Sequence, residues 1–270
     1  MSLKILEKLL RLIRLFLNLL QIYRPLLNKI RRDRVKKFEK KRKVTFLVYQ
    51  SAVWKSDGVY KLLDSMHDVE VSVTILPIIS NNRILNDDLD RTLKYFKDKN
   101  LNTNVVYKDR NFFNAVKYFK NVDTIVFSDC WNLSNSILYY YLFLTKDCVY
   151  VPYSHQVSKY DNYQSQYNQL IHNFVRSIYA PHEYEYEIYD SSSYTKNDNV
   201  KFFGYPGVVK IIEGFDIEFS GDGSVSSIFP NNPWSRLPNK QAKKLIWAPH
   251  HSINWKNRKY SNFLEMHDLM

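Results

Sequence analysis

Short strands and helices alternate along the chain from Val44 to about residue 206, and this order admits few folds. Runs rich in β-branched and aromatic residues are predicted as strands at 44–50, 71–79, 104–107, 123–128, 148–153 and 200–204. Stretches with helical length and periodicity lie between them, at 53–67, 86–99, 110–120 and 133–144. Such strand-helix repeats imply a parallel sheet covered on both faces, so residues 44–206 are expected to form a Rossmann-like α/β domain.

The loops that follow the strands are the expected ligand-binding places, because such sheets bind ligands beyond the carboxyl ends of their strands. The candidate loops are SAVWKSDG after the first strand, residues 155–172 after the fifth strand, and the turn GYPG at 204–207. No glycine-rich dinucleotide motif and no P-loop occurs. Cys130 and Cys148 lack metal-ligand spacing and are expected to be buried thiols, so no metal ion or other cofactor is predicted.

The first 43 residues carry the whole excess of positive charge. They hold 15 Lys or Arg and 3 acidic residues, which is a net charge of +12 and equals the net charge of the entire chain. Polar residues recur every three or four positions among leucines and isoleucines, which predicts an amphipathic helix, and a basic run follows at 31–43. This pair of features is typical of peripheral binding to an anionic leaflet. The residues expected to contact lipid headgroups are Arg31, Arg32, Arg34, Lys36, Lys37, Lys40 and Lys41.

Other roles for residues 1–43 fit the pattern less well. Charges interrupt every apolar run, which argues against a transmembrane span, and no small-residue cleavage site follows, which argues against a signal peptide. The alternative is a helix that packs on a partner protein or on a second copy of the chain. Nucleic acid is not an expected partner, because the basic residues lack interleaved aromatics and the remainder of the chain has no excess charge.

The periodicity is lost at residues 207–243, which collect Gly, Pro, Ser and Asn and are predicted to be a linker. KKLIWAP then begins a new strand, and YSNFLEMHDLM begins a helix with Ser261 as its N-cap. One strand and one helix cannot bury a core, so residues 244–270 are expected to be the start of a second, incomplete domain. The alternative is that this strand and helix complete the first domain.

Several motifs taken in order resemble those of the bacterial CDP-glycerol glycerophosphotransferases, the teichoic-acid polymerase-like enzymes of surface-polymer and capsule synthesis. They are YVPYSH, QYNQLIHN, FFGYPG, NPWSR, KKLIWAPHHSI and YSNFLEMHDLM. The resemblance runs from about Val44 to the last residue, and IWAPHHSI followed by the Ser-x-Phe-Leu helix is its most specific part.

The resemblance implies a GT-B fold with an N-terminal acceptor half and a C-terminal donor half. The implied reaction moves a glycerol-phosphate, polyol-phosphate or sugar unit from CDP-glycerol or a similar nucleotide-activated donor to a lipid-linked acceptor. It is metal-independent and takes place at the cytoplasmic face of the bacterial membrane. Family members hold the donor pyrophosphate with a His-Pro motif in the second half, and this sequence contains no His-Pro pair. The chain is therefore expected to be a truncated and inactive form.

The reaction needs a base for the acceptor hydroxyl, and histidine has a suitable pKa. His155, just past the fifth strand, is the first candidate; Tyr153 in the same loop is a candidate substrate contact. His172 and Asn168 have helical spacing, so both are predicted on one face that lines the acceptor cleft or is a polar helix surface. Asp57 is predicted to bind the acceptor or to cap the helix after the first strand.

His250 and His251, with Ser252, follow the strand that opens the second domain, and are predicted to bind phosphate at the mouth of the interdomain cleft. The alternative is a turn with one buried and one exposed imidazole. The enzyme hypothesis itself has two rivals. One is a non-catalytic membrane-bound protein, and the other is a carbohydrate-binding module in which many of the 21 tyrosines line a groove.

Overall fold

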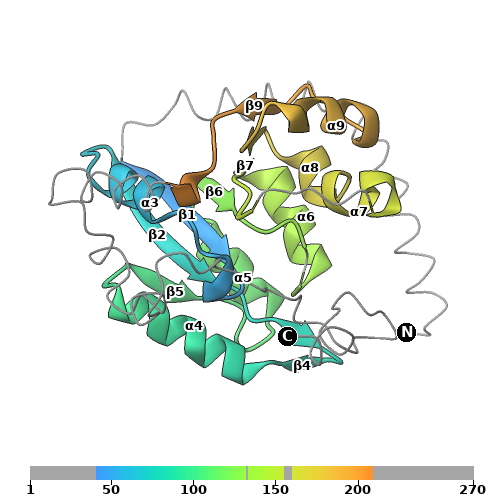
Figure 1. The fold of residues 1–270 in the computed structure, drawn as a ribbon. Coiled ribbons are helices and arrows are strands. Elements are labelled where there is room, and N and C mark those ends of the chain that lie inside the picture. The colour runs from blue at the N-terminus through green and yellow to red at the C-terminus, as the bar shows by residue number, and fades with distance from the viewer. Residues whose placement is uncertain (1–40, 132, 155–159, 209–270) are drawn as a thin grey trace, which may run out of the picture. The chain divides into compact units, whose positions relative to one another are not determined.

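Seven parallel strands form the sheet at the centre of the domain (Figure 1). The computed structural model describes residues 41–131, 133–154 and 160–208. Across the sheet the strands are β5 (Thr103–Val105), β2 (Val69–Ile75), β1 (Arg42–Val48), β6 (Thr124–Phe127), β7 (Asp147–Tyr150), β8 (Ser177–Ala180) and β9 (Val200–Phe202). The prediction of a Rossmann-like α/β fold with a parallel sheet is confirmed.

The central strands are apolar on both faces, as a sheet between two helical layers requires. The last five residues of β1 and all four of β6 are buried, and Phe46 of β1 lies opposite Val73 of β2 and Val126 of β6. This register brings the ends of β1 and β6 to the same edge of the sheet.

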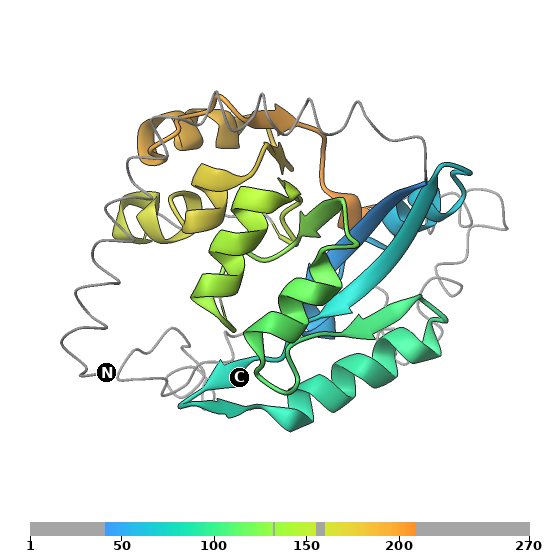
Figure 2. The same ribbon diagram turned by 180° about the vertical axis from the view of Figure 1, so that it is seen from behind.

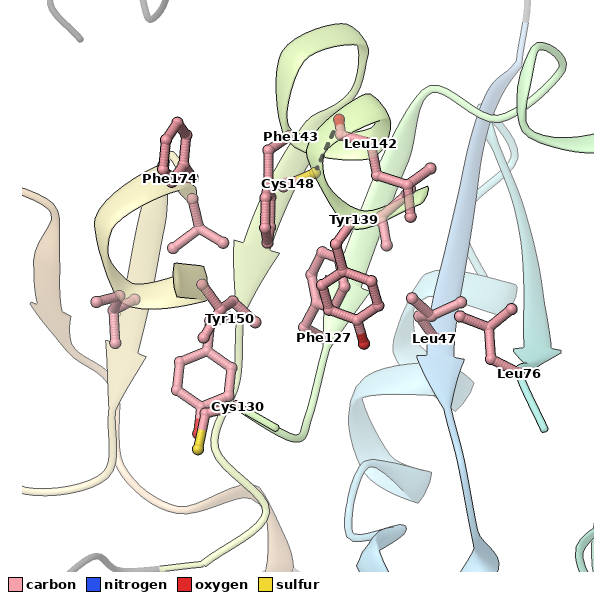
Figure 3. Close-up of a cluster of buried hydrophobic side chains, with 14 of the residues drawn as sticks. Leu47, Leu76, Phe127, Cys130, Tyr139, Leu142, Phe143, Cys148, Tyr150 and Phe174 are labelled. Atoms are coloured by element: carbon pink, nitrogen blue, oxygen red, sulfur yellow. Dashed lines mark hydrogen bonds between the residues drawn. The ribbon is translucent and has the colours of Figure 1, made fainter. Parts of the chain in front are cut away.

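Helices cover the two faces in two groups (Figures 1 and 2). The first group is α3 (Asp57–Asp64) and α4 (Asn86–Asp98), and the second is α5 (Phe112–Phe119), α6 (Ser136–Thr145), α7 (Gln164–Tyr167), α8 (Leu170–Phe174) and α9 (Tyr184–Ser192). Each group contributes to its own hydrophobic core, one around Phe46 and Phe96, the other around Phe127 and Phe143 (Figure 3). Short 3-10 turns occupy Ser51–Val53, Tyr160–Tyr163 and Pro206–Val208.

The predicted burial of both cysteines is confirmed. Cys130 and Cys148 are 4% and 0% exposed, and the thiol of Cys148 donates to the carbonyl of Leu142 at 3.5 Å (Figure 3). Burial raises the pKa of the Cys130 thiol, so this thiol stays protonated at neutral pH.

The second predicted strand, 71–79, was too long. β2 ends at Ile75, two residues before Pro77, which has no N–H to donate to a neighbouring strand. The chain then forms a separate hairpin of β3 (Ile79–Ser80) and β4 (Arg83–Ile84). Asn81 and Asn82 have φ values of 49° and 60°, as the two-residue turn of a tight hairpin requires.

The single helical face predicted for Asn168 and His172 is wrong. Helix α7 ends at Tyr167, α8 spans only Leu170–Phe174, and the chain then enters β8, which the sequence pattern did not reveal. Arg176 leaves the helix and pairs with Asp147 of β7, with 2.6 Å between Nε and Oδ1. Pairing of Ile178 with Tyr150 and Val200 stabilises the strand and overrides the helical spacing.

Candidate functional site

The strand order changes direction between β1 and β6. From β1 the chain passes to β2 and β5 on one side, and from β6 it passes to β7, β8 and β9 on the other. The crevice at such a switch point, beyond the carboxyl ends of the strands, is where open α/β sheets bind ligands. The residues that directly follow β6 lie at this switch point.

Asp129 lies in the loop that begins at the carboxyl end of β6, immediately after Ser128. Its side chain is 4% exposed, and its Oδ1 accepts a hydrogen bond from the backbone N–H of Trp131 at 2.8 Å. Burial raises the pKa of Asp129 to about 6, although the hydrogen bond from Trp131 opposes the shift. A carboxyl group with a pKa near neutrality at a switch point can exchange a proton with a ligand hydroxyl.

Tyrosines from other elements surround this loop. The N–H of Tyr153 donates to the carbonyl of Ser128 at 3.0 Å, and the hydroxyl of Tyr205 donates to the carbonyl of Tyr153 at 2.7 Å. The Tyr150 ring and the Cys130 thiol lie together at the carboxyl end of β7 (Figure 3). Burial, and then the nearby Asp129 carboxylate, raise the pKa of Tyr153, so its phenol remains neutral.

Two distant segments hold the loop that carries Asp129. The N–H of Ile79, in the β3–β4 hairpin, donates to the carbonyl of Leu133 at 2.9 Å. The Nδ2 of Asn135 donates to the hydroxyl of Tyr107 at 2.6 Å, while Asn135 Oδ1 caps α6 by accepting from the N–H of Leu138. Tyr107 has φ +69°, an uncommon conformation for a buried aromatic residue. Strain of this kind gathers at functional sites.

Substitution of Tyr107 with Phe tests this contact. The variant Tyr107→Phe keeps the ring but leaves the Nδ2 of Asn135 without its acceptor, so we expect a loss of about 1 kcal/mol in the free energy of unfolding. Urea denaturation checks the value, and Tyr194→Phe, on an exposed side chain, is the matched control. An unchanged midpoint for Tyr107→Phe would mean that Asn135 finds another partner.

Of the residues predicted from sequence, Tyr153 lies beside the Asp129 loop. The prediction that Asp57 caps the helix after the first strand is wrong. Ser56 holds the N-cap position of α3, and Asp57 is the first helical residue. Its Oδ1 accepts from Trp54 Nε1 at 2.6 Å, and its Oδ2 pairs with Lys99 Nζ at 2.8 Å. These contacts tie the loop after β1 to the end of α4.

Asn168 and His172 are engaged in contacts within the domain. Asn168 Oδ1 accepts from Asn173 Nδ2 at 2.9 Å and from the N–H of Tyr194 at 3.1 Å. His172 is 0% exposed, and its Nδ1 accepts from the N–H of Gln169 at 2.9 Å. Burial lowers the pKa of His172 to about 3, which is too low for a general base at neutral pH. Neither side chain joins Asp129.

The remaining predicted residues fall outside the described ranges. They are His155, the group His250, His251 and Ser252, and the basic residues Arg31, Arg32, Arg34, Lys36, Lys37 and Lys40. Lys41 is described and is exposed immediately before β1. Within the described ranges no cluster of His, Cys, Asp or Glu could hold a metal ion, and no helix there is long and apolar enough to cross a membrane.

Asp129 was missed by the motif search, although its position gave a clue. The predicted strand DTIVFS ends one residue before it, so Asp129 is the first residue beyond a carboxyl end. No short motif marks this carboxylate, and its burial depends on the packing of residues far away in sequence. In comparisons with known proteins, no family model and no curated protein matches the chain.

Proposed function

We propose that the chain is the acceptor-binding part of a membrane-associated transferase of bacterial cell-surface polymer synthesis. The observation that supports this function best is a buried carboxyl group with a pKa of about 6 at the switch point of a parallel sheet. Such a group can receive the proton of an attacking hydroxyl. The resemblance to the CDP-glycerol glycerophosphotransferases, with their GT-B fold, suggests the reaction class.

In the proposed step an acceptor hydroxyl attacks the glycerol-bearing phosphorus of CDP-glycerol. A bond forms between the acceptor oxygen and phosphorus, and the bond from phosphorus to the bridging oxygen breaks. CMP leaves with the electron pair, and the Asp129 carboxylate takes the proton from the attacking hydroxyl. Proton transfer by a positioned side chain contributes roughly 10²–10⁴-fold to a rate, so Asp129 has a large role in this scheme.

The transfer assay uses the full chain, CDP-glycerol labelled in its glycerol and a bacterial membrane fraction as the source of lipid-linked acceptor. The absence of a His-Pro pair predicts that the chain alone is inactive, whereas the buried carboxyl of Asp129 supports transfer. If the chain transfers as proposed, label enters the lipid fraction and an equal amount of CMP is released. Absence of both, with CDP-glycerol and with nucleotide sugars, would contradict the proposal. The protein would then be a non-catalytic membrane-bound or carbohydrate-binding protein.

The proposed peripheral attachment to the cytoplasmic face rests on the basic run at 31–43 and gives its own prediction. Each basic residue near an anionic surface contributes about 1 kcal/mol, so Lys36→Gln with Lys37→Gln should weaken binding by about 30-fold. Co-sedimentation with phosphatidylglycerol vesicles measures the change. A matched variant, Lys94→Gln with Lys97→Gln on α4, should bind as the unmodified chain does. Equal loss in both variants would mean that only total charge matters.

A further inference from the structure

Neutral groups surround the Asp129 carboxyl. The described groups that interact electrostatically with it are the Cys130 thiol and the phenols of Tyr150 and Tyr153. Among the described residues no Lys or Arg contributes to the shift in the pKa of Asp129. An anionic group brought to this carboxylate would meet a like charge with little solvent to screen it, which is unfavourable. The group that contacts Asp129 directly is therefore better a neutral hydroxyl of the acceptor than a phosphate, and the donor phosphate of the proposed step lies beyond that hydroxyl.

Hydrogen-bonding capacity remains at this loop. Asp129 Oδ1 accepts a hydrogen bond from the N–H of Trp131. The hydroxyl of Ser128, which is 1% exposed, has no hydrogen-bond partner within the described part of the chain. A carboxylate accepts several hydrogen bonds, and a serine hydroxyl both donates and accepts. Two neighbouring residues can thus bind hydroxyl groups of a ligand.

Three aromatic residues lie next to the loop that carries Asp129. Trp131, Tyr153 and Tyr205 are all half-buried, and each is joined to the Asp129 loop directly or through one further hydrogen bond. Several other tyrosines in the described ranges, such as Tyr139 and Tyr189, are buried in the core instead. The face of an aromatic ring is negative and attracts the C–H groups of a sugar ring, whose hydroxyls bind carboxylates.

We propose that the edge formed by Ser128, Asp129, Trp131, Tyr153 and Tyr205 binds an uncharged sugar ring. This inference rests on the proposed function and specifies it: the acceptor end that meets Asp129 is a neutral glycan rather than a polyol-phosphate chain. The hydroxyl nearest Asp129 is the one that attacks the donor, and an aromatic ring holds the apolar face of the sugar.

The test compares ligands of equal shape and different charge. The full chain is titrated at neutral pH with methyl glycosides of glucose, galactose and N-acetylglucosamine, with the matching uronates of the first two, and with glycerol 3-phosphate. Saturation-transfer NMR reports binding. We expect a neutral glycoside to bind at least about tenfold more tightly than its uronate, a modest effect for two charges in a partly buried site. Asp129→Asn should remove this preference.

Variants of the rings identify the site. Trp131→Ala should lose glycoside binding, while Trp131→Phe, which keeps a ring and the backbone N–H, should retain most of it. Tyr194→Ala, on an exposed ring outside the edge, should bind as the unmodified chain does. If Trp131→Ala does not fold, the uronate comparison on the unmodified chain and on Asp129→Asn decides the matter.

Three results would overturn the neutral-glycan inference: uronates that bind as tightly as their neutral partners, glycerol 3-phosphate that binds more tightly than any glycoside, or no glycoside binding at all. Transfer activity that depends on Asp129 would leave the proposed function standing in each of these cases. Conversely, glycoside binding without transfer from any donor would remove the transferase proposal and keep the sugar site.

Discussion

Asp129→Asn is expected to lower transfer activity at least about 100-fold, the lower limit for loss of a general base, and to make the protein more stable at neutral pH. Burial holds the pKa of Asp129 at about 6, so the folded protein at neutral pH contains a carboxylate that would be better solvated in the unfolded chain. The shift from about 3.9 to about 6 corresponds to about 3 kcal/mol. An uncharged amide of similar shape removes this cost.

The pH dependence has a definite sign. Between about pH 3.9 and pH 6 the folded state holds a proton on Asp129 that the unfolded state has released, so stability falls as pH rises through this window. Above about pH 6 both states are ionised and the penalty is constant. Asp129→Asn lacks this dependence, and its gain in the free energy of unfolding should therefore vanish in acid.

Asp109 offers a matched control. It is an exposed carboxylate in the loop after β5, and hydrogen bonds from the N–H of Asn111 and the side chain of Asn114 lower its pKa. Asp109→Asn should not raise stability at neutral pH and should leave transfer unchanged. Asp129→Glu, which keeps the charge but moves it, should lose activity without gaining stability. Equal transfer by Asp129→Asn and the unmodified chain would exclude Asp129 as the base.

The fold could be predicted further from sequence than the site could. The short β-branched runs predict six of the seven strands, because strands buried on both faces are rich in β-branched and aromatic residues, as in VTFLV of β1. β8 was not predicted, because SIYA is short and lies within a stretch of helical spacing. Its strand conformation comes from pairing with β7 and β9, which local pattern does not contain.

Side-chain roles depend on partners that are distant in the chain. Lys99, the ion-pair partner of Asp57, lies 42 residues away, and the rings that enclose His172 come from β7 and α9. Neither arrangement could be read from spacing. Asp129 differs, because its place directly after a predicted strand puts it where parallel sheets bind ligands. Only the packed structure shows that burial shifts its pKa. Position in the fold could be inferred from the sequence, and electrostatic environment could not.

His172 should make the folded protein sensitive to acid. Burial lowers its pKa to about 3, far below the value of about 6.5 in an unfolded chain. The hydrogen-bond network assigns the proton of the neutral ring to Nε2, because Nδ1 accepts from the N–H of Gln169. Protonation of Nδ1 would replace this attraction by two opposed donors. The edges and faces of Tyr150 and Tyr189 pack against the ring, with centroids 5.2 and 5.5 Å away.

The sign is opposite to that of Asp129. Between about pH 6.5 and pH 3 the unfolded chain binds a proton that the folded His172 does not, so stability falls as the pH falls. The shift in the pKa of His172 contributes about 4–5 kcal/mol to the free energy of unfolding, of which about 2 kcal/mol is lost as the pH falls from ~7.5 to ~5. Over the same interval the protonation of Asp129 raises the free energy of unfolding by about 1.4 kcal/mol, which offsets most of this loss in the unmodified chain.

Single variants separate the effects of the two groups. When the pH falls from ~7.5 to ~5, the free energy of unfolding of Asp129→Asn should fall by about 2 kcal/mol, because only His172 still titrates. Over the same interval the free energy of unfolding of His172→Asn should rise by about 1.4 kcal/mol above its own value at ~pH 7.5. Asn at position 172 offers an acceptor to the N–H of Gln169 and cannot titrate. His182→Asn is the matched control, since His182 Nδ1 also accepts a local backbone N–H, from Tyr184 at 3.0 Å, but the ring is exposed. Urea denaturation at both pH values measures these slopes. If His172→Asn and the unmodified chain show the same pH dependence, His172 does not remain neutral in the folded protein.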